Sequence, residues 1–149
     1  MRIWFRDYKL EEIIAVTDRY MGKHIGIELI ELGDDFIKGK MPVDDRTKMP
    51  FGLLHGGASC VLAETLGSCA SNLCIDPTKN SAVGLEINAN HIRSVTSGYV
   101  IGVARPVHLG RSVHVWDIRL HEESSDKLTC VSRLTMKVLD RSEGSLPAG

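Results

Sequence analysis

Apolar residues recur along this chain in two different rhythms. Between residues 57 and 73 apolar and small side chains fall on nearly every side of a helix, whereas later segments alternate apolar and polar positions in places, as strands do. Asp76-Pro77 marks the end of the helical stretch, because a proline cannot continue a helix. The pattern predicts a long helix followed by four strands, over 57–73, 81–92, 98–108, 112–121 and 127–139.

The first fifty residues carry weaker versions of the same two patterns. Leu10, Ile13, Ile14 and Thr17 recur at helical spacing, which predicts a short amphipathic helix over 8–20 with Asp7 as its cap. Two strands are expected next, over 24–32 and 35–41, joined by a hairpin turn at Gly33-Asp34. Residues 42–55 are interrupted by Pro42, Pro50 and Gly52, which indicates a loop.

The order of these elements predicts an α+β fold in which an antiparallel sheet wraps around the long helix. The turns at 96–98, 109–110 and 123–126 are short enough for antiparallel hairpins. Ala58, Ala63, Gly67 and Ala70 are small enough to let the sheet or a twin helix approach closely. We expect a single domain over 1–140, followed by a flexible polar tail over 141–149.

Composition narrows the possible partners. Eighteen basic and 19 acidic residues give a net charge of −1, which argues against bulk affinity for nucleic acid. No apolar run approaches the length of a membrane span, and the first residues lack the apolar core of a secretory signal, so a cytoplasmic protein is expected. The four cysteines lack zinc spacing, which favours reduced core thiols and predicts no metal site. They are Cys60, Cys69, Cys74 and Cys130.

Glu64 stands out because it is a carboxylate in the middle of an apolar helix. Burying a carboxylate is costly, so such a residue is either paired or functional. His55 precedes it by nine residues, which places the two about 180° apart around a helix and roughly 13 Å apart along it. They can share one site only if a second copy of the helix runs antiparallel alongside. Ser68, at i+4, lies on the same helical face as Glu64.

His55-Gly56-Gly57 lies where the helix begins. The first N–H groups of a helix lack intrahelical acceptors, and the helix dipole is positive at that end. A thioester carbonyl placed there would be polarised as it becomes tetrahedral. The sequence therefore predicts a site for developing negative charge at this terminus.

The motifs around these residues resemble those of the hotdog-fold acyl-CoA thioesterases. The strongest matches are PFGLLHGG at 50–57 and AETLGS at 63–68, supported by MPVD at 41–44, VGLEINANHIR at 83–93, HLG at 108–110 and SRLT at 132–135. The resemblance covers roughly residues 3 to 139. It is closest to the branch that includes dihydroxynaphthoyl-CoA hydrolase of menaquinone biosynthesis and the proofreading thioesterase of enterobactin biosynthesis.

The resemblance implies roles for the residues already singled out. Glu64 would attack the thioester or activate water, two mechanisms that sequence does not separate. The N–H of Gly56 would supply the oxyanion contact, His55 would position the thioester of the partner chain's site, and the Ser68 hydroxyl would hold the carboxylate or the water. The family further implies a homo-oligomer with shared sites, arranged as a dimer of dimers, and a reaction that needs no cofactor.

Coenzyme A contacts are implied at two places. His91, Arg93 and Ser94 form one group, and Gly84 would lie near the pantetheine arm. A second group consists of His108, Gly110, Arg111 and Ser112. Arg93 and Arg111 are at strand ends, where a guanidinium could bind phosphate.

Met49 departs from the pattern, because related thioesterases carry Gln, Asn or Asp at the position before Pro50. Methionine has no strong donor or acceptor with which to orient water or substrate. Three functions therefore remain open. The leading one is hydrolysis of an aromatic acyl-CoA, such as dihydroxynaphthoyl-CoA or a benzoyl-CoA, and the second is proofreading of a misloaded aryl carrier protein. The third is acyl-CoA binding without catalysis.

Overall fold

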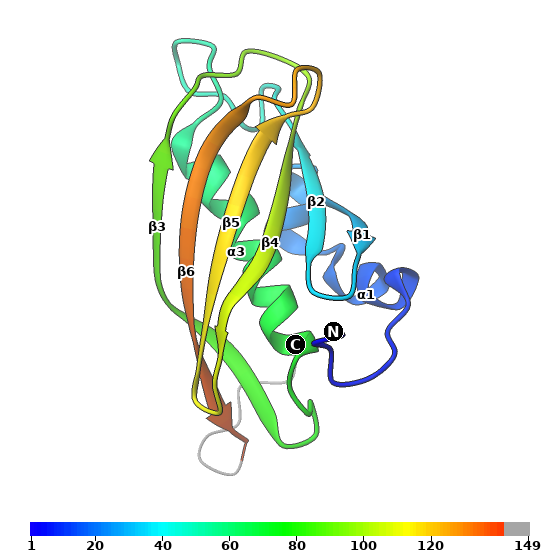
Figure 1. Cartoon of the computed structure of the whole chain (residues 1–149). Coiled ribbons are helices and arrows are strands. Elements are labelled where there is room, and N and C mark those ends of the chain that lie inside the picture. The colour runs from blue at the N-terminus through cyan, green and yellow to red at the C-terminus, as the bar shows by residue number, and fades with distance from the viewer. Residues whose placement is uncertain (142–149) are drawn as a thin grey trace.

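The computed structural model describes residues 1–141, which form three helices and one six-stranded antiparallel sheet (Figure 1). The predicted tail lies, from residue 142 onward, outside the described residues. The helices are α1 (Leu10–Thr17), α2 (Tyr20–His24) and α3 (Gly56–Leu73). The strands are β1 (Glu28–Leu32), β2 (Ile37–Pro42), β3 (Asn80–His91), β4 (Tyr99–Leu109), β5 (Val113–Glu122) and β6 (Leu128–Asp140).

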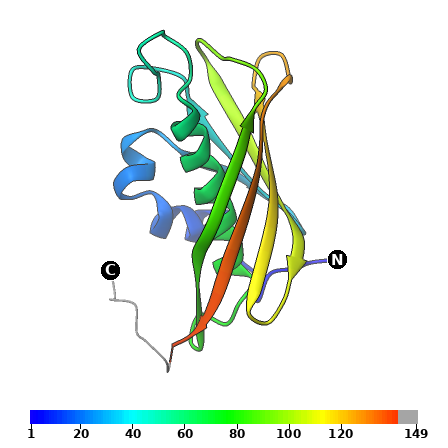
Figure 2. The same cartoon turned by 90° about the vertical axis from the view of Figure 1, so that its left-hand side faces the viewer.

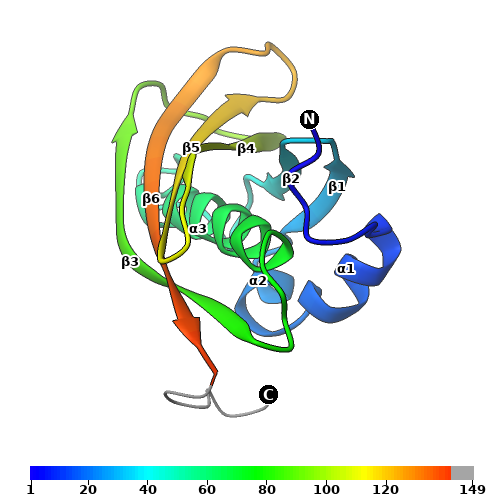
Figure 3. The same ribbon diagram turned by 60° about the horizontal axis from the view of Figure 1, so that its bottom comes forward.

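The sheet curves around α3, which lies in its concave face (Figure 3). Figure 2 shows α3 between the sheet on one side and the two short helices α1 and α2 on the other. This arrangement confirms the predicted α+β architecture of a sheet wrapped around a long helix.

Small residues let α3 approach the sheet closely. Ala63 and Ala70 are fully buried, and a Cβ added at Gly67 would lie 2.5 Å from Leu134 Cδ2 of β6. Leu66 in turn lies over Gly102 of β4, where a Cβ would meet its Cδ1 at 2.7 Å. Of the two partners that the sequence allowed for this small-residue face, the sheet is the one that contacts it.

Two polar contacts fix the far half of α3. The indole N–H of Trp116 on β5 donates to Ser71 Oγ at 2.6 Å, and both side chains are fully buried. The Asn72 amide pairs with the backbone of Ala82 on β3, donating to its carbonyl at 3.1 Å and accepting from its N–H at 3.0 Å. Because buried polar groups left unpaired are costly, these contacts select one position of the helix against the strands.

The strand order β1-β2-β4-β5-β6-β3 places β3 at an edge of the sheet. The predicted hairpins β1–β2, β4–β5 and β5–β6 are confirmed, but the one expected at 96–98 is wrong, because β3 pairs with β6 and not with β4. Residues 92–98 instead cross to the loop before α3, where Val95 is buried and its carbonyl accepts the N–H of Leu54. Turn length alone does not distinguish a hairpin from such a crossing.

The first predicted helix is shorter than expected. Lys9, not Asp7, is the N-cap of α1, and the helix ends at Thr17. The Asp7 carboxylate accepts instead from the Arg2 guanidinium at 2.6 Å. An ion pair outside the helix has therefore replaced the predicted cap.

The strand predicted from residue 24 is also wrong at its start, because α2 occupies 20–24 and β1 begins at Glu28. Gly26, at φ +80°, ends α2 in a Schellman motif, in which Ile27 N–H donates to Gly22 O and Gly26 N–H donates to Lys23 O. Ile25 and Ile27 are buried by this turn, so their alternation mimics a strand. A glycine after a short helix was the signal that could have revealed it.

His114, at the start of β5, is 3% exposed, and its Nδ1 atom has no hydrogen-bond partner among the described residues. Burial lowers the pKa of His114, nearby His108 lowers it further, and the Gly110 carbonyl partly opposes both. The unfolded chain therefore binds this proton more readily than the folded chain does. The contribution is fully present above the ordinary pKa of about 6.5 and is lost as the pH falls below it.

We accordingly expect His114→Gln to reduce the loss of unfolding free energy between pH 7.5 and pH 5, because glutamine does not titrate. Urea unfolding at the two pH values measures this difference. His24→Gln is the matched control, since His24 is exposed on α2. An unchanged pH dependence in the His114 variant would show that another group carries the acid sensitivity.

Candidate active site

The N-terminus of α3 is capped by His55, whose Nδ1 accepts the N–H of Gly57 at 2.8 Å. The Gly56 N–H makes no hydrogen bond within the described chain. It is therefore available to an oxygen atom at the positive end of an 18-residue helix. This is the arrangement expected for the candidate oxyanion site.

His91 closes one side of this terminus. It is the last residue of β3, and its Nε2 would lie 2.7 Å from a Cβ added at Gly56. Only a glycine leaves the imidazole its place, so Gly56 provides both a free N–H and room for a neighbour. The two residues are 35 positions apart, and their contact could not be read from spacing.

A cavity of about 330 Å³ opens at this end of the molecule. Six residues that the sequence singled out line it, namely Met49, His55, Gly56, His91, Arg93 and Ser94. Leu53, Leu54, Ser59, Ile92 and Thr129 complete the lining. Arg93 also holds the turn before β6, because its Nη1 donates to Leu128 O at 2.9 Å.

Met49 belongs to a tight turn beside this cavity. Its carbonyl accepts the N–H of Gly52, which lies at φ +79°, and its sulfur accepts the N–H of Phe51 at 3.3 Å. The turn leaves Phe51 84% exposed. Met49 therefore supplies a weak acceptor at a backbone donor that an amide oxygen could also reach.

Glu64 lies further along α3 and is directed toward the edge strand. Its Oε1 is 2.8 Å from the position that a Cβ would take at Gly84 on β3. The ladder with β6 shifts register between Gly84 and Glu86, and Leu85 between them is 60% exposed. The Glu64 side chain is half-buried, and within residues 1–141 no hydrogen bond or salt bridge engages its carboxylate. A free carboxylate thus lies beside the open edge of the sheet.

Ser68 follows Glu64 on α3, but its hydroxyl is directed elsewhere. Ser68 Oγ donates to Met136 Sδ of β6 at 3.6 Å, a weak bond that a better acceptor could displace. In this chain it therefore does not hold the Glu64 carboxylate. Ser68 also lines a second, larger cavity between α3 and the two short helices.

The remaining predicted residues lie at the opposite end of the sheet. His108, Gly110, Arg111 and Ser112 form the turn between β4 and β5, which Figure 1 shows far from the start of α3. Gly110 N–H donates to Val113 O, and a Cβ at Gly110 would lie 2.5 Å from His108 Nε2. The two groups of predicted coenzyme A residues do not meet within one chain.

The comparisons with known proteins agree on one family. Residues 51–129 match the model of the thioesterase superfamily. The chain is 49% identical to 1,4-dihydroxy-2-naphthoyl-CoA hydrolase of Escherichia coli over 137 residues, 92% of this chain and 99% of that protein. It is 47% identical to the proofreading thioesterase EntH of Cronobacter turicensis, over 92% of this chain and 98% of that protein.

This chain is a hotdog-fold thioesterase. Its solved relatives include a variant of thioesterase PA1618 from Pseudomonas aeruginosa, with 50% identity, a TM-score of 0.89 and coverage of 93% of this chain and 99% of that one. Thioesterase SAV0944 from Staphylococcus aureus is shorter. One of its variant structures covers 81% of this chain and 99% of its own, with 40% identity and a TM-score of 0.78.

The thioesterase carries free thiols on the helix that bears Glu64. Cys60, Cys69 and Cys74 lie on α3 or at its end, and none of the described cysteines forms a disulfide. Burial raises the pKa of Cys69 and of Cys74 to about 12, so both stay protonated near neutral pH. They behave as small apolar residues and not as nucleophiles.

Two further surveys of residues 1–141 complete the description. No cluster of three or more His, Cys, Asp or Glu side chains in this part has the geometry of a metal site. The described helices are all too short or too polar to cross a bilayer.

Proposed function

We propose that this thioesterase hydrolyses an aromatic acyl-CoA, with Glu64 as the residue that attacks the thioester or activates water. The free Glu64 carboxylate beside Gly84 is the observation that carries the proposal. SAV0944 has been solved with a glutamine at its position 32 and with a glutamate at its position 47 replaced by alanine. Those positions are 15 residues apart, as are Met49 and Glu64 here.

A complete site requires a second copy of the chain. His55 and Glu64 are on opposite sides of α3 and roughly 13 Å apart along it, so one chain does not bring them to one carbonyl. The open edge of β3 lies beside Glu64, and a two-fold dimer formed there would bring the N-terminus of one α3 toward the Glu64 of the other. We propose this dimer as the active unit and a pair of dimers as the assembly.

The chemistry then follows from the charges that develop. The Gly56 N–H of one chain donates to the thioester oxygen as it becomes negative, aided by the helix dipole. Glu64 of the other chain removes a proton from water while the water oxygen adds to the carbonyl carbon. The tetrahedral intermediate collapses, the C–S bond breaks, and the coenzyme A thiolate leaves and is protonated. Direct attack by Glu64 would instead pass through an acyl anhydride, which water then hydrolyses.

The two coenzyme A groups are proposed to serve from different chains. Arg93 lies in the smaller cavity, and Arg111 is exposed on the β4–β5 turn without an ion pair in the described residues. Each offers guanidinium N–H groups to a phosphate. His91 and Ser94 would accompany Arg93, His108, Gly110 and Ser112 would accompany Arg111, and Gly84 would face the pantetheine arm beside Glu64.

Thiol release from matched substrates tests the function. We expect turnover of 2-naphthoyl-CoA and benzoyl-CoA to exceed that of the same acyl groups on an aryl carrier protein. Arg93 is the single permanent charge in the smaller cavity's lining, which suits a nucleotide phosphate better than an extended acidic surface. Faster turnover of the carrier-bound groups would establish the proofreading function. No turnover of any thioester would overturn both.

Met49→Gln should raise kcat by about tenfold with little change in KM, because one restored hydrogen bond contributes roughly 1.4 kcal/mol to the transition state. The P. aeruginosa relative has a glutamine at its own position 49, which was replaced by alanine in the solved variant. Met49→Leu is the control, since it keeps the apolar volume and adds no amide. Lower activity in the Gln variant would mean that Met49 packs against the acyl group.

A further inference from the structure

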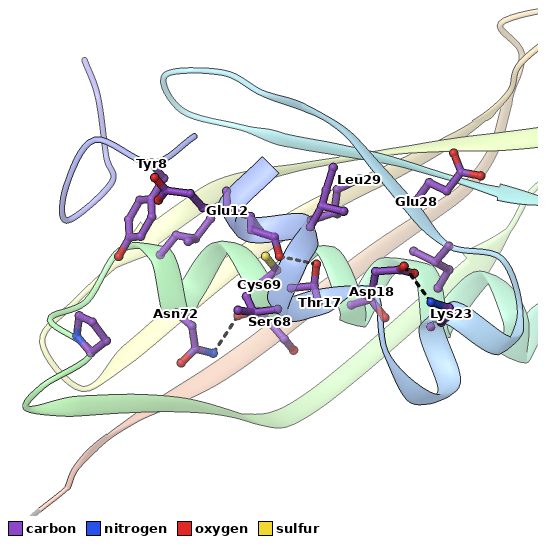
Figure 4. A pocket seen from close by; sticks show the side chains of 18 of the residues that line it. Tyr8, Glu12, Thr17, Asp18, Lys23, Glu28, Leu29, Ser68, Cys69 and Asn72 are labelled. Atoms are coloured by element: carbon purple, nitrogen blue, oxygen red, sulfur yellow. Dashed lines mark hydrogen bonds and ion pairs between the residues drawn. The ribbon is translucent and has the colours of Figure 1, made fainter. Parts of the chain in front are cut away.

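The largest cavity of the described chain is not explained by the site above. It measures about 920 Å³ and lies between α3, the two short helices and β1 (Figure 4). Its roof includes Ile13 and Ile14 of α1, and Leu29 of β1 forms one wall. Its floor is Thr65, Ser68 and Cys69 of α3.

The polar groups of this cavity are already paired or neutral. At its rim, Arg6 pairs with Glu12 at 3.1 Å and Lys23 pairs with Asp18 at 3.2 Å. The Asn72 amide is bonded to Ala82, and the Cys69 thiol stays protonated because burial raises its pKa to about 12. An interior with so few free polar groups favours an uncharged ligand.

The cavity adjoins the Glu64 carboxylate along α3. Thr65 follows Glu64 directly, Ser68 lies one turn further, and Leu73 closes the row roughly 13 Å from Glu64 along the helix axis. A thioester carbon held at Glu64 could therefore extend its acyl group beneath α1. A bicyclic aromatic group fits within this length, and so does a medium-length chain.

The shorter relative separates α1 from the chemistry. Its two substituted positions are numbered 17 lower than Met49 and Glu64, so its chain starts near Asp18 of this one. Helix α1 ends at Thr17 and therefore has no counterpart there. A segment absent from a relative in which the Gln–Glu spacing is kept suits selection of the acyl group and not the reaction itself.

We propose that the cavity beneath α1 binds the uncharged acyl group of the substrate, and that α1 selects acyl groups by covering it. This inference rests on the proposed function, because it assumes hydrolysis at Glu64. It assigns the aromatic or aliphatic part of the substrate to α1, Leu29 and Cys69, and leaves coenzyme A to the residues described above.

Filling the cavity tests the proposal. Ile14→Trp adds bulk to its roof, whereas Ala15→Trp places the same ring on the exposed side of α1, outside the lining. We measure kcat/KM for 2-naphthoyl-CoA and for acetyl-CoA and express preference as their ratio. Ile14→Trp should lower this ratio at least about tenfold, the scale of lost contacts for one buried ring, and Ala15→Trp should leave it within twofold.

Cys69→Phe fills the floor and provides a second variant if Ile14→Trp does not fold, as judged by thermal unfolding. An unchanged ratio in folded, filled variants would overturn this inference while leaving hydrolysis at Glu64 intact. A change of oligomer size in sedimentation, without a change of ratio, would show that a second copy covers the cavity and would overturn it too. Absence of turnover in the unmodified protein would overturn the proposed function instead.

Discussion

Glu64→Gln should lower kcat by about a thousandfold or more, the scale expected when a general base or nucleophile is lost. The amide has the shape of the carboxylate but neither takes a proton from water near neutral pH nor attacks a thioester. Because Gly84 leaves space beside this side chain, the amide fits without displacing β3. Because no hydrogen bond engages the carboxylate within the described chain, the substitution removes no contact that holds the fold.

The measurement is thiol release under saturating 2-naphthoyl-CoA, accompanied by thermal unfolding of each variant. Glu123→Gln in the β5–β6 turn makes the same chemical change at an exposed position far along the chain from the site. It should leave both kcat and Tm unchanged. Near-normal turnover in a folded Glu64→Gln protein would remove Glu64 from the mechanism, whatever its position suggests.

Mixing two inactive variants should restore activity. Each site of the proposed dimer uses Glu64 of one chain and the N-terminus of α3 from the other, so a His55→Ala/Glu64→Ala hybrid has one intact site and one doubly altered site. At equal concentrations half of the dimers are hybrids, which predicts recovery of about a quarter of the wild-type activity for a two-fold dimer. The gain starts from almost nothing and is therefore easy to detect.

Subunit exchange must be shown independently, for example with two mass-tagged chains. His24→Ala replaces His55→Ala in the control mixture, where the exposed His24 variant is expected to be active by itself. Exchange without recovery would mean that each chain carries a whole site, or that His55 only caps α3 through Gly57. A Gly56→Ala partner, in which a Cβ would displace His91, distinguishes these two cases.

The long helix and the strand boundaries were predictable because each rests on local periodicity. The predicted start of α3 at Gly57 is one residue from the observed start, and the predicted hairpins at 109–110 and 123–126 are present. The partner of β3 was not predictable, because a strand's pattern shows which face is buried and not which strand lies beside it. The mistaken strand start at residue 24 has the same origin, since Ile25 and Ile27 are buried by a helix-ending turn.

The candidate site shows the same division. His55 and Gly56 were identified because a glycine pair before a helix has a local physical meaning. The contact of His91 with Gly56, and that of Glu64 with Gly84, depend on β3 returning past α3. The cavity beneath α1 combines segments from residue 6 to residue 77, and no motif marks it. Contacts of that range follow from the folded chain alone.

The position of β3 also has a kinetic consequence. Strands β4, β5 and β6 are joined by short turns and can pair soon after they are formed, whereas β3 must wait for β6, with partners 60 residues apart at Asn80 and Asp140 and 39 apart at His91 and Cys130. Pairing over such separations is slow, because loop closure precedes the gain from contacts. We therefore expect β3 to dock last in refolding. Since β3 carries both Gly84 and His91, a chain that has acquired most of its sheet would still be catalytically silent.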